Sequence, residues 1–491
     1  MNSIPVSRRD WLLRASVPLW APAAPAQAAK PNILFLVVDD LDCRIGCYGD
    51  PVAKTPNLDR LARQGVRFDR AYCQFPLCNP TRSSVLSGRY PTSTGVLDNN
   101  TWLTLEDGQH MMPEYFQRNG YQIGTFGKIW HGPNKGFHRG DPLPPSQNAS
   151  AWSTARDRAR QQSEDPAYWE KSFTPYRTMR LPEPRNYAVA NNYGPLPDGD
   201  PGVDVPIADD ALGWLQKAQG GAKPFFLAVG FHRPHVPLIA PKKYFDMFDP
   251  TEMRLPVDFD TEPRAIRGVP RDEFRQNIDL FAARSFSTLE AREAMRAYYA
   301  CIAYMDDQVG RLLDRIQAMG VAGNTIVVLW GDHGWHLGEK GMWAKGTLFE
   351  TSARGPMIIS DPRLRTAGQA SPRVVQYLDM YPTLVDLCGL PKASWHEGTS
   401  LAPLLADPRR EWDRPAYTVQ VRSWFIGRSL RNERWRYTEW DEGRRGAALY
   451  DHDSDPHEMR NLAAVPTWSR QMQELQRQLR SGPIARNPPG A

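Results

Sequence analysis

The 491-residue chain is poor in cysteine, in clustered positive charge and in long apolar runs, and each shortage excludes a class of protein. Six cysteines are too few for a disulfide-rich scaffold, and their spacing (positions 43, 47, 73, 78, 301 and 388) matches no zinc knuckle. The net charge is only +5 and no run of Lys or Arg stands out, so we expect no nucleic-acid partner. No internal run approaches the roughly 18 apolar residues of a membrane span, so we expect none.

The first 28 residues have the order of features of an export signal. Residues 7–13, SRRDWLL, resemble a twin-arginine signal, a modest apolar stretch follows, and AQA at 26–28 offers small residues for cleavage. The alternative is a basic tail without fixed structure. We favour recognition by the twin-arginine export machinery and a location in the periplasm or outside the cell.

Four nearly unbroken apolar runs each end in ionisable residues. They are NILFLVVDD (32–40), YQIGTFGKIWH (121–131), PFFLAVGFHRPH (224–235) and NTIVVLWGDHGW (324–335). Such runs are typical of strands buried on both faces of a parallel sheet, and ligands bind at the carboxyl ends of strands in these sheets. A loop residue with its hydrogen bonds satisfied locally would explain the ionisable residue after any one run. Ionisable residues after all four runs indicate one shared site.

Apolar spacing predicts helices between the strands, at 56–65, 288–319 and 376–390. Strands alternating with helices indicate an α/β fold with a large, mostly parallel central sheet flanked by helices.

Two later stretches differ from the rest in composition and in the pattern of their apolar residues. Residues 141–206 are rich in Pro, Asn, Asp and Arg, so we expect a long surface insertion near the site. After about residue 400, short alternating runs predict a small antiparallel sheet, with a closing helix at 469–480. The expected organisation is a signal peptide (1–28), a catalytic domain (29–400) and a C-terminal subdomain (401–491).

Ionisable residues end two of the apolar runs: Asp39 and Asp40 follow the first run, and Asp332 and His333 follow the last. Paired carboxylates repel unless a cation lies between them. Three carboxylates suit Ca²⁺ or Mg²⁺, and a histidine ligand leaves Mn²⁺ and Zn²⁺ open. The alternative is two solvated aspartates in a turn and a buried Asp–His pair.

The stretch PLCNPTRSSVLSGRYP (76–91) places a thiol at a helix start. Pro80 suits a first helical turn, so Cys78 would lie near a helix N-terminus, which favours an anion. Arg82, one turn on, can offer a forked donor to the same spot. The residues leave Cys78 open as a nucleophile, a metal ligand, a disulfide partner or a precursor. Cysteine phosphatases need five residues between Cys and Arg, and here there are three.

Cys-x-Pro-x-Arg followed by SSVLSGRYP resembles the signature of the type I sulfatases of the alkaline phosphatase superfamily. Other segments from about residue 30 to 465 resemble the same family in order, among them NILFLVVDDL, GKIWH, FFLAVGFHRPHVP and LYDHDSDPHEMRNL. GDHGWHLGEKGMWAKGTLFE is most similar to the iduronate-2-sulfatase branch, with choline sulfatases next. His333, where many sulfatases have Asn, fits that branch.

The resemblance implies a role for each matching position. A formylglycine-generating enzyme would oxidise Cys78 to formylglycine, the nucleophile. An oxygen of that residue would bind one Ca²⁺, with Mg²⁺ less favoured, together with Asp39, Asp40, Asp332 and His333. Arg82 would hold the modified residue, Lys128 and Lys345 would grip sulfate oxygens, His131 would take a hydroxyl proton, and His232 would serve the leaving-group oxygen.

The implied function is hydrolysis of sulfate esters on a sulfated saccharide, as in glycosaminoglycan degradation. The rival hypotheses are a choline sulfatase, a phosphonate or phosphodiester hydrolase of the same superfamily, and a non-catalytic sugar-binding protein. The filled catalytic positions argue against the last. Further pocket candidates are Trp335 and His235, followed by His110, His138 and His336.

Overall fold

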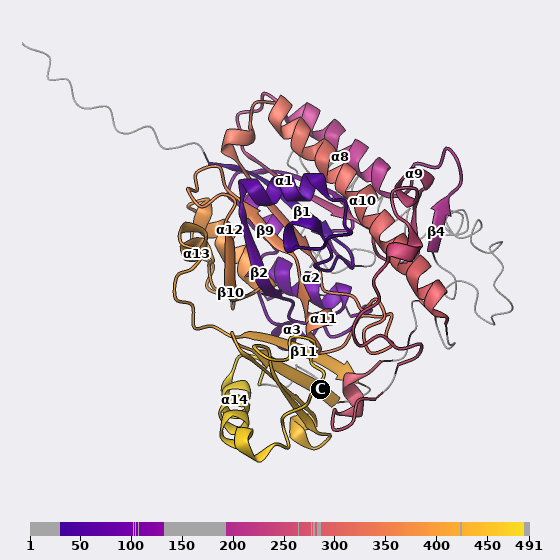
Figure 1. Ribbon diagram of the computed structural model, residues 1–491. Coiled ribbons are helices and arrows are strands. Elements are labelled where there is room, and N and C mark those ends of the chain that lie inside the picture. Colours follow the sequence, from indigo (N-terminus) through magenta and orange to yellow (C-terminus); the bar gives the residue numbers. More distant parts are fainter. Residues whose placement is uncertain are drawn as a thin grey trace, which may run out of the picture.

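The computed structural model describes residues 30–485, without 102, 104, 107, 132–192, 264, 276, 278–279, 282–285 and 423–424. The expected signal peptide (1–28) and most of the expected insertion lie outside these ranges. Figure 1 shows a large sheet between layers of helices, with a smaller sheet beside one end. The predicted α/β fold class is confirmed.

The central sheet has the strand order β10-β2-β9-β7-β1-β5-β3, and the short strand β8 also pairs with β2. Along this order β9 is antiparallel to its neighbours and the remaining pairs are parallel, so the sheet is mostly parallel as predicted. The four apolar runs form β1, β3, β5 and β7. The bounds are Asn32–Val38 (β1), Val66–Tyr72 (β2), Gln122–Gly127 (β3), Phe225–Phe231 (β5), Thr325–Gly331 (β7), Arg354–Gly355 (β8), Met357–Ser360 (β9) and Ala370–Gln376 (β10).

Alternate side chains of β1 enter two separate cores, because successive residues of a strand point to opposite faces. Leu34 and Leu36 pack with residues of α1, α8 and α10, whereas Phe35 and Val37 pack with residues of α2, α4 and α12. The helices therefore cover both faces of the sheet (Figure 1). Their bounds are Pro56–Gln64 (α1), Cys78–Ser87 (α2), Pro91–Thr94 (α3), Met112–Arg118 (α4), Asp204–Ala218 (α8), Lys242–Phe245 (α9), Thr288–Ala318 (α10), Glu350–Ala353 (α11) and Met380–Leu387 (α12).

The helices predicted at 56–65 and 288–319 are confirmed as α1 and α10. At the start of α10, the side chain of Ser287 accepts from the backbone N–H of Glu290 and the Glu290 side chain accepts in return, which is a capping box. The helix predicted at 376–390 starts later than expected. A 3₁₀ turn precedes α12, and the Asp379 carboxylate accepts from the backbone N–H of Gln376 at 2.9 Å.

Of the surface insertion predicted over 141–206, only residues 193–206 are described; most of them are partly or fully exposed, but they contain a strand and a helix start that were not predicted. β4 (Tyr193–Leu196) pairs with β6 (Leu238–Pro241), and α8 begins at Asp204. The hydroxyl of Tyr304 on α10 accepts from the backbone N–H groups of Asp204 and Val205 at 2.9 and 3.0 Å. Remote partners hold both elements, which is why local periodicity did not reveal them.

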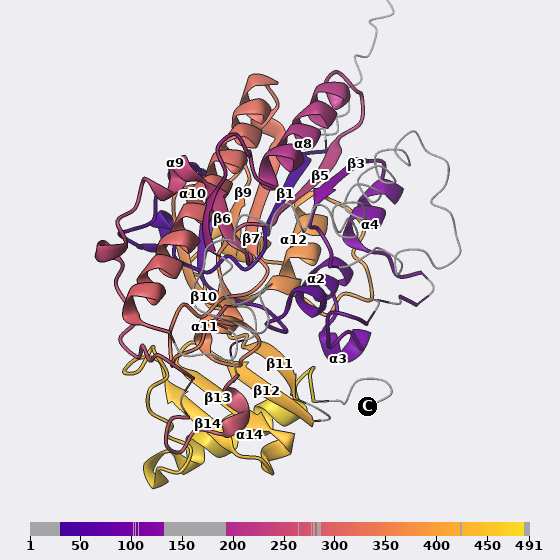
Figure 2. The same cartoon turned by 90° about the vertical axis from the view of Figure 1, so that its right-hand side faces the viewer.

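The predicted C-terminal antiparallel sheet is confirmed as β11–β14, and α14 covers it. This sheet lies beside α2 and α11, at one end of the central sheet (Figures 1 and 2). α13 (Ala402–Ala406) instead packs Leu404 and Leu405 into a core of the larger domain. The bounds are Ala416–Arg422 (β11), Phe425–Arg431 (β12), Trp435–Trp440 (β13), Ala447–Asp451 (β14) and Ser469–Ser481 (α14).

Within the described ranges, no helix is both long enough and apolar enough to cross a lipid bilayer.

Candidate active site

The carboxyl ends of β1, β3, β5 and β7 lie at one edge of the central sheet. Val38 of β1 is level with Phe231 of β5 and Gly331 of β7, and Gly127 of β3 is level with Gly230. The residues that follow these strand ends are therefore neighbours in space. They are Asp39, Lys128, His232 and Asp332, each named from the sequence as a site residue.

Cys78 is the first residue of α2, and its thiol is fully buried. The sulfur lies 3.2 Å from Nζ of Lys345 and 3.5 Å from Nε2 of His333. Oδ1 of Asp40 is 4.0 Å away. The helix start predicted from Pro80 is confirmed, and all six cysteines are unpaired, which removes the disulfide alternative for Cys78.

Arg82, one helical turn after Cys78, joins three of the strand ends. Its Nε donates to Oδ2 of Asp332 at 2.9 Å, and its Nη2 donates to Oδ1 of Asp39 at 3.0 Å. Its Nη1 donates to the carbonyl of Lys128. The side chains of Arg82 and both aspartates are fully buried. A buried guanidinium needs such compensation, so this arrangement fixes Arg82 and its partners together.

Two lysines compensate the aspartates that follow β1. The ammonium of Lys128 pairs with Asp39, and that of Lys345 donates to Oδ1 of Asp40 at 2.6 Å. Burial acts to raise the pKa of Asp39, but Lys128 and the other cationic neighbours outweigh it and hold that pKa well below its usual value. Burial raises the pKa of Asp40 well above its usual value, against the attraction of Lys345. For Asp40, therefore, the attraction of Lys345 does not offset the cost of burying the charged carboxylate.

Among the residues that the structure describes, Oδ2 of Asp40 has no hydrogen-bond partner although it is buried. Oxygens of Asp39, Asp40 and Asp332 lie within 4.8 Å of one another, and Nε2 of His333 is 3.4 Å from Oδ1 of Asp40. An unpaired buried carboxylate oxygen is unfavourable, and clustered carboxylates are the ligands that hard divalent cations prefer. The residues therefore fit a divalent cation. The alternative of two solvated aspartates is wrong, since Asp39 and Asp40 are buried.

Two histidines close to Lys128 are neutral. Burial, reinforced by Lys128, lowers the pKa of His131 and of His232 to about 3. Nδ1 of His131 is buried without a partner among the described residues. The backbone N–H of His232 donates to Asp204 at 2.8 Å, which fixes the loop after β5. Both imidazoles are therefore uncharged at pH 7 and weakly basic.

His235 also joins the cluster. Its Nε2 lies 3.8 Å from Oδ2 of Asp40 and 4.0 Å from Oδ2 of Asp39, and its Nδ1 is 2.6 Å from the carbonyl of Val236. The sequence named His235 only as a further pocket candidate. Of the other candidates, His110 contacts Glu114, His336 contacts Thr347, and His138 lies outside the described residues.

Trp335 packs against Lys345. The indole is only 1% exposed, and Nζ of Lys345 lies 5.3 Å from the centroid of its ring. This cation–π contact orients the ammonium. Trp335 therefore supports a site residue and does not form the wall of an open sugar pocket.

Tyr298 supports the turn that carries Asp40. Asp40 has a φ of +58°, in the left-handed region that is uncommon for residues other than glycine. The hydroxyl of Tyr298 donates to the Asp40 carbonyl at 2.7 Å and accepts from the backbone N–H of Asp42 at 3.0 Å. Tyr298 fits the apolar spacing that predicts the helix at 288–319, and periodicity alone does not show where a hydroxyl points.

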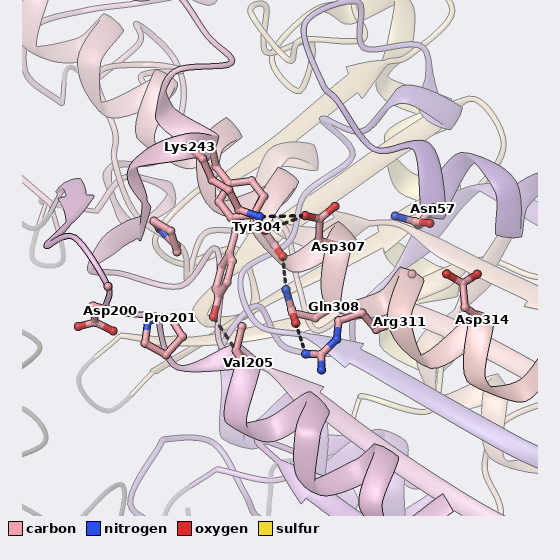
Figure 3. A pocket seen from close by; sticks show the side chains of 14 residues that line it. Asn57, Asp200, Pro201, Val205, Lys243, Tyr304, Asp307, Gln308, Arg311 and Asp314 are labelled. Atoms are coloured by element: carbon pink, nitrogen blue, oxygen red, sulfur yellow. Dashed lines mark hydrogen bonds and ion pairs between the residues drawn. The ribbon is translucent and has the colours of Figure 1, made fainter.

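A separate cavity of about 640 Å³ lies between α9, α10 and the start of α8 (Figure 3). None of the site residues named from the sequence lines it. Its charged groups have partners of their own: Lys243 lies 3.9 Å from Asp307, and Arg311 donates to Gln308 at 2.9 Å. We assign no ligand to this cavity.

Residues 31–390, well over half of the chain, match the family model described as Sulfatase. The chain belongs to the sulfatase family. It is accordingly a sulfuric ester hydrolase, as its sequence resemblance implied. Residues 338–483 also match a model described as N-sulphoglucosamine sulphohydrolase, C-terminal, and this match includes the end of the larger domain and all of the C-terminal sheet.

Individual relatives agree with this assignment. A sulfatase of Formosa agariphila is 30% identical over 88% of this chain and 83% of that protein. Iduronate 2-sulfatase of Homo sapiens is 28% identical over 88% of this chain and 90% of that protein. The crystal structure of the phosphonate monoester hydrolase of Agrobacterium radiobacter has a TM-score of 0.72 at 23% identity, covering 92% of this chain and 95% of that one. That likeness supports the fold.

Replacing Tyr298 by Phe tests the support of the Asp40 turn. The variant leaves the Asp42 N–H and the Asp40 carbonyl without their buried partner, so we expect the free energy of unfolding to fall by about 1–3 kcal/mol. Displacement of Asp40 should also lower kcat/KM on p-nitrophenyl sulfate about tenfold or more.

Tyr299→Phe is the matched control, because the hydroxyl of Tyr299 donates to Asp50 instead, at 2.8 Å. Urea unfolding should register both variants, whereas kcat/KM should fall only for Tyr298→Phe. Equal activity of the two variants would contradict the assigned role.

Proposed function

We propose that this sulfatase removes a sulfate ester from a sulfated carbohydrate, with a substrate preference like that of iduronate 2-sulfatase. The observation that carries the proposal is the convergence at Cys78, whose sulfur lies 3.2 Å from the Lys345 ammonium and 3.5 Å from the His333 imidazole. The similarity to human iduronate 2-sulfatase over most of both chains supports the sugar class. His333, where many sulfatases have Asn, fits the same branch.

We propose Ca²⁺ as the metal, with Mg²⁺ less favoured because it demands a stricter octahedral geometry. Asp39, Asp40, Asp332 and His333 would hold it, together with an oxygen of the modified Cys78. When bound, it would polarise a sulfate oxygen and offset developing negative charge.

Charge balance supports an anionic substrate. The three aspartates face three cationic side chains, those of Arg82, Lys128 and Lys345, so the side chains alone are close to neutral. A divalent cation would leave an excess of positive charge, and a sulfate monoester brings one negative charge to the same place.

Formylglycine at position 78 would supply, in its hydrated form, one hydroxyl for attack on sulfur and a second for release of sulfate. Its formation requires a formylglycine-generating enzyme as a partner. Arg82 would hold the modified side chain from α2, because its guanidinium is already fixed by Asp39 and Asp332.

The remaining roles follow from charge and protonation. Lys128 and Lys345 would bind sulfate oxygens, and the Trp335 ring holds the latter ammonium in place. His131 is neutral, with a pKa of about 3, and it would take a proton from the hydroxyl of the modified residue once negative charge brought by the substrate raises that pKa. His232 is neutral in the free enzyme; negative charge brought by the substrate near Lys128 would favour its protonated form and proton donation to the leaving oxygen.

We also propose export through the twin-arginine machinery to the periplasm or beyond, on the strength of residues 7–13 and 26–28. An N-terminal peptide starting at Ala29 in the exported enzyme would support this, and one that retains Arg8 and Arg9 would contradict it.

A substrate panel tests the proposed function. We expect kcat/KM to be highest for a saccharide carrying a uronate 2-sulfate, about tenfold or more above hexosamine sulfates, choline sulfate and p-nitrophenyl phosphonate esters. Fastest turnover of choline sulfate or of a phosphonate ester would overturn the sugar assignment in favour of the corresponding rival.

Mass spectrometry of the Cys78 peptide tests the nucleophile. Conversion to formylglycine lowers the peptide mass by about 18 Da relative to the thiol. We expect Cys78→Ala to lower kcat on the order of 10⁴-fold or more. Cys73→Ala, a buried thiol five positions earlier, should retain activity. An unmodified thiol in fully active enzyme would contradict the proposal.

Metal removal tests the cation. Dialysis against EDTA should abolish activity and lower the melting temperature, and Ca²⁺ should restore both better than Mg²⁺ does. A ligand at 100 times its Kd stabilises the fold by about 2.7 kcal/mol. Asp40→Asn should remove the Ca²⁺-dependent shift, whereas Asp258→Asn, a buried acid paired with Lys340, should keep it. A shift that persists in Asp40→Asn would place the cation elsewhere.

A further inference from the structure

One face of β11 donates hydrogen bonds to backbone carbonyls of the larger domain. Thr418, Gln420 and Arg422 alternate along the strand and so share a face. Oγ1 of Thr418 donates to the carbonyl of Cys73 at 2.7 Å. Nε2 of Gln420 and Nη2 of Arg422 both donate to the carbonyl of Gly346, each at 2.6 Å. The C-terminal sheet therefore contacts the residue that directly follows Lys345.

The backbone around Lys345 has little freedom. Nη1 of Arg275 donates to the carbonyl of Lys345 at 3.0 Å. Gly346 has a φ of +84°, and a Cβ there would lie 2.8 Å from Nε2 of Gln420 and closer still to Arg275. Donors thus surround this peptide so tightly that only glycine fits the position.

The far end of the same segment is held in the same way. Arg436 of β13 donates to Oε2 of Glu350 at 2.6 Å. The backbone N–H of Glu350 donates to Oε2 of Glu458 at 2.7 Å. Residues of the C-terminal subdomain therefore fix the chain at Gly346 and again at Glu350, on either side of the turn that leads away from Lys345.

Fold stability alone gives little reason for this choice of side chains. Arg422 is largely buried, and burial, then repulsion from Arg275, lowers its pKa to about 10. Keeping two guanidiniums near each other in the protein interior is unfavourable, and well-packed apolar side chains would often do as well. A need to fix the positions of the Lys345 and Gly346 carbonyls would explain why donors were chosen here.

We propose that Gln420 and Arg422 are positioning residues, which act through the Gly346 carbonyl to hold the Lys345 ammonium against Cys78 and Asp40. This inference rests on the proposed function, in which Lys345 binds a sulfate oxygen. It gives the C-terminal sheet a role in the active site, because the ammonium reaches both groups, at 3.2 and 2.6 Å, from a backbone position that this sheet helps to hold.

A double-mutant cycle tests the proposal on the full-length, modified enzyme. Gln420→Met and Arg422→Met remove a donor and keep an unbranched chain of similar length. Each should lower kcat/KM on p-nitrophenyl sulfate roughly ten- to a hundredfold and weaken binding of inorganic sulfate in calorimetry. Arg422→Lys, which keeps a donor, should recover much of the loss.

The cycle is completed in the Lys345→Ala background. There Gln420→Met should change kcat/KM by no more than about twofold, because its effect passes through a side chain already absent. Thr418→Val is the matched control on the same face of β11 and should stay within about twofold of wild type. Melting temperatures identify any variant that fails to fold, in which case the Arg422→Met and Arg422→Lys pair carries the same test.

The outcomes distinguish the proposed role of Lys345 from the proposed role of Gln420 and Arg422. Wild-type activity of Lys345→Ala would overturn the proposed role of Lys345 itself. A severe loss in Lys345→Ala with wild-type activity in Gln420→Met and Arg422→Met would overturn only the positioning role. A full additional loss from Gln420→Met in the Lys345→Ala background would indicate general damage to the fold and would also overturn it.

Discussion

The guanidinium of Arg82 is fully buried. Two carboxylates and one backbone carbonyl accept its hydrogen bonds and so stabilise the buried positive charge. Asp39 and Asp332 follow different strands, so these ion pairs fix two strand ends relative to each other. α2 carries Cys78 one turn before Arg82, so the same pairs also place the thiol. Strand register brings the acids together, and Arg82 sets the position of the helix against them.

Much of this arrangement could be predicted because parallel strands in register end at one edge. An apolar run that stops at Asp39 and another that stops at Asp332 need only the sheet to bring them together. The helical stripe of α10 and the alternation in β11–β14 are likewise local patterns, and both predictions were confirmed. Lys345 and the roles of Cys78 and Arg82 came from motif resemblance, which carries information that periodicity does not.

The rest depends on contacts between remote segments, which no local pattern records. α8 went unrecognised because its first residues, at Asp204, rely on Tyr304 of another helix. Tyr298 has the spacing of a core residue, yet its hydroxyl supports the backbone of a site residue far away in sequence. Gln420 looks like any polar residue in an alternating strand until its partner, Gly346, is known. Hydrophobic periodicity and composition predict which face of a helix or strand is buried. They do not predict the hydrogen-bond partner of a buried polar side chain.

The depth of Cys78 has a consequence for the order of events in the cell. Its side chain has no exposed surface once α2 is packed, and every residue of that helix is buried. An enzyme that modifies this side chain, as the proposed function requires, would therefore have to reach residues 76–91 before α2 packs. Oxidation would then have to precede folding, and a chain that folds before it is oxidised would be well folded but inactive.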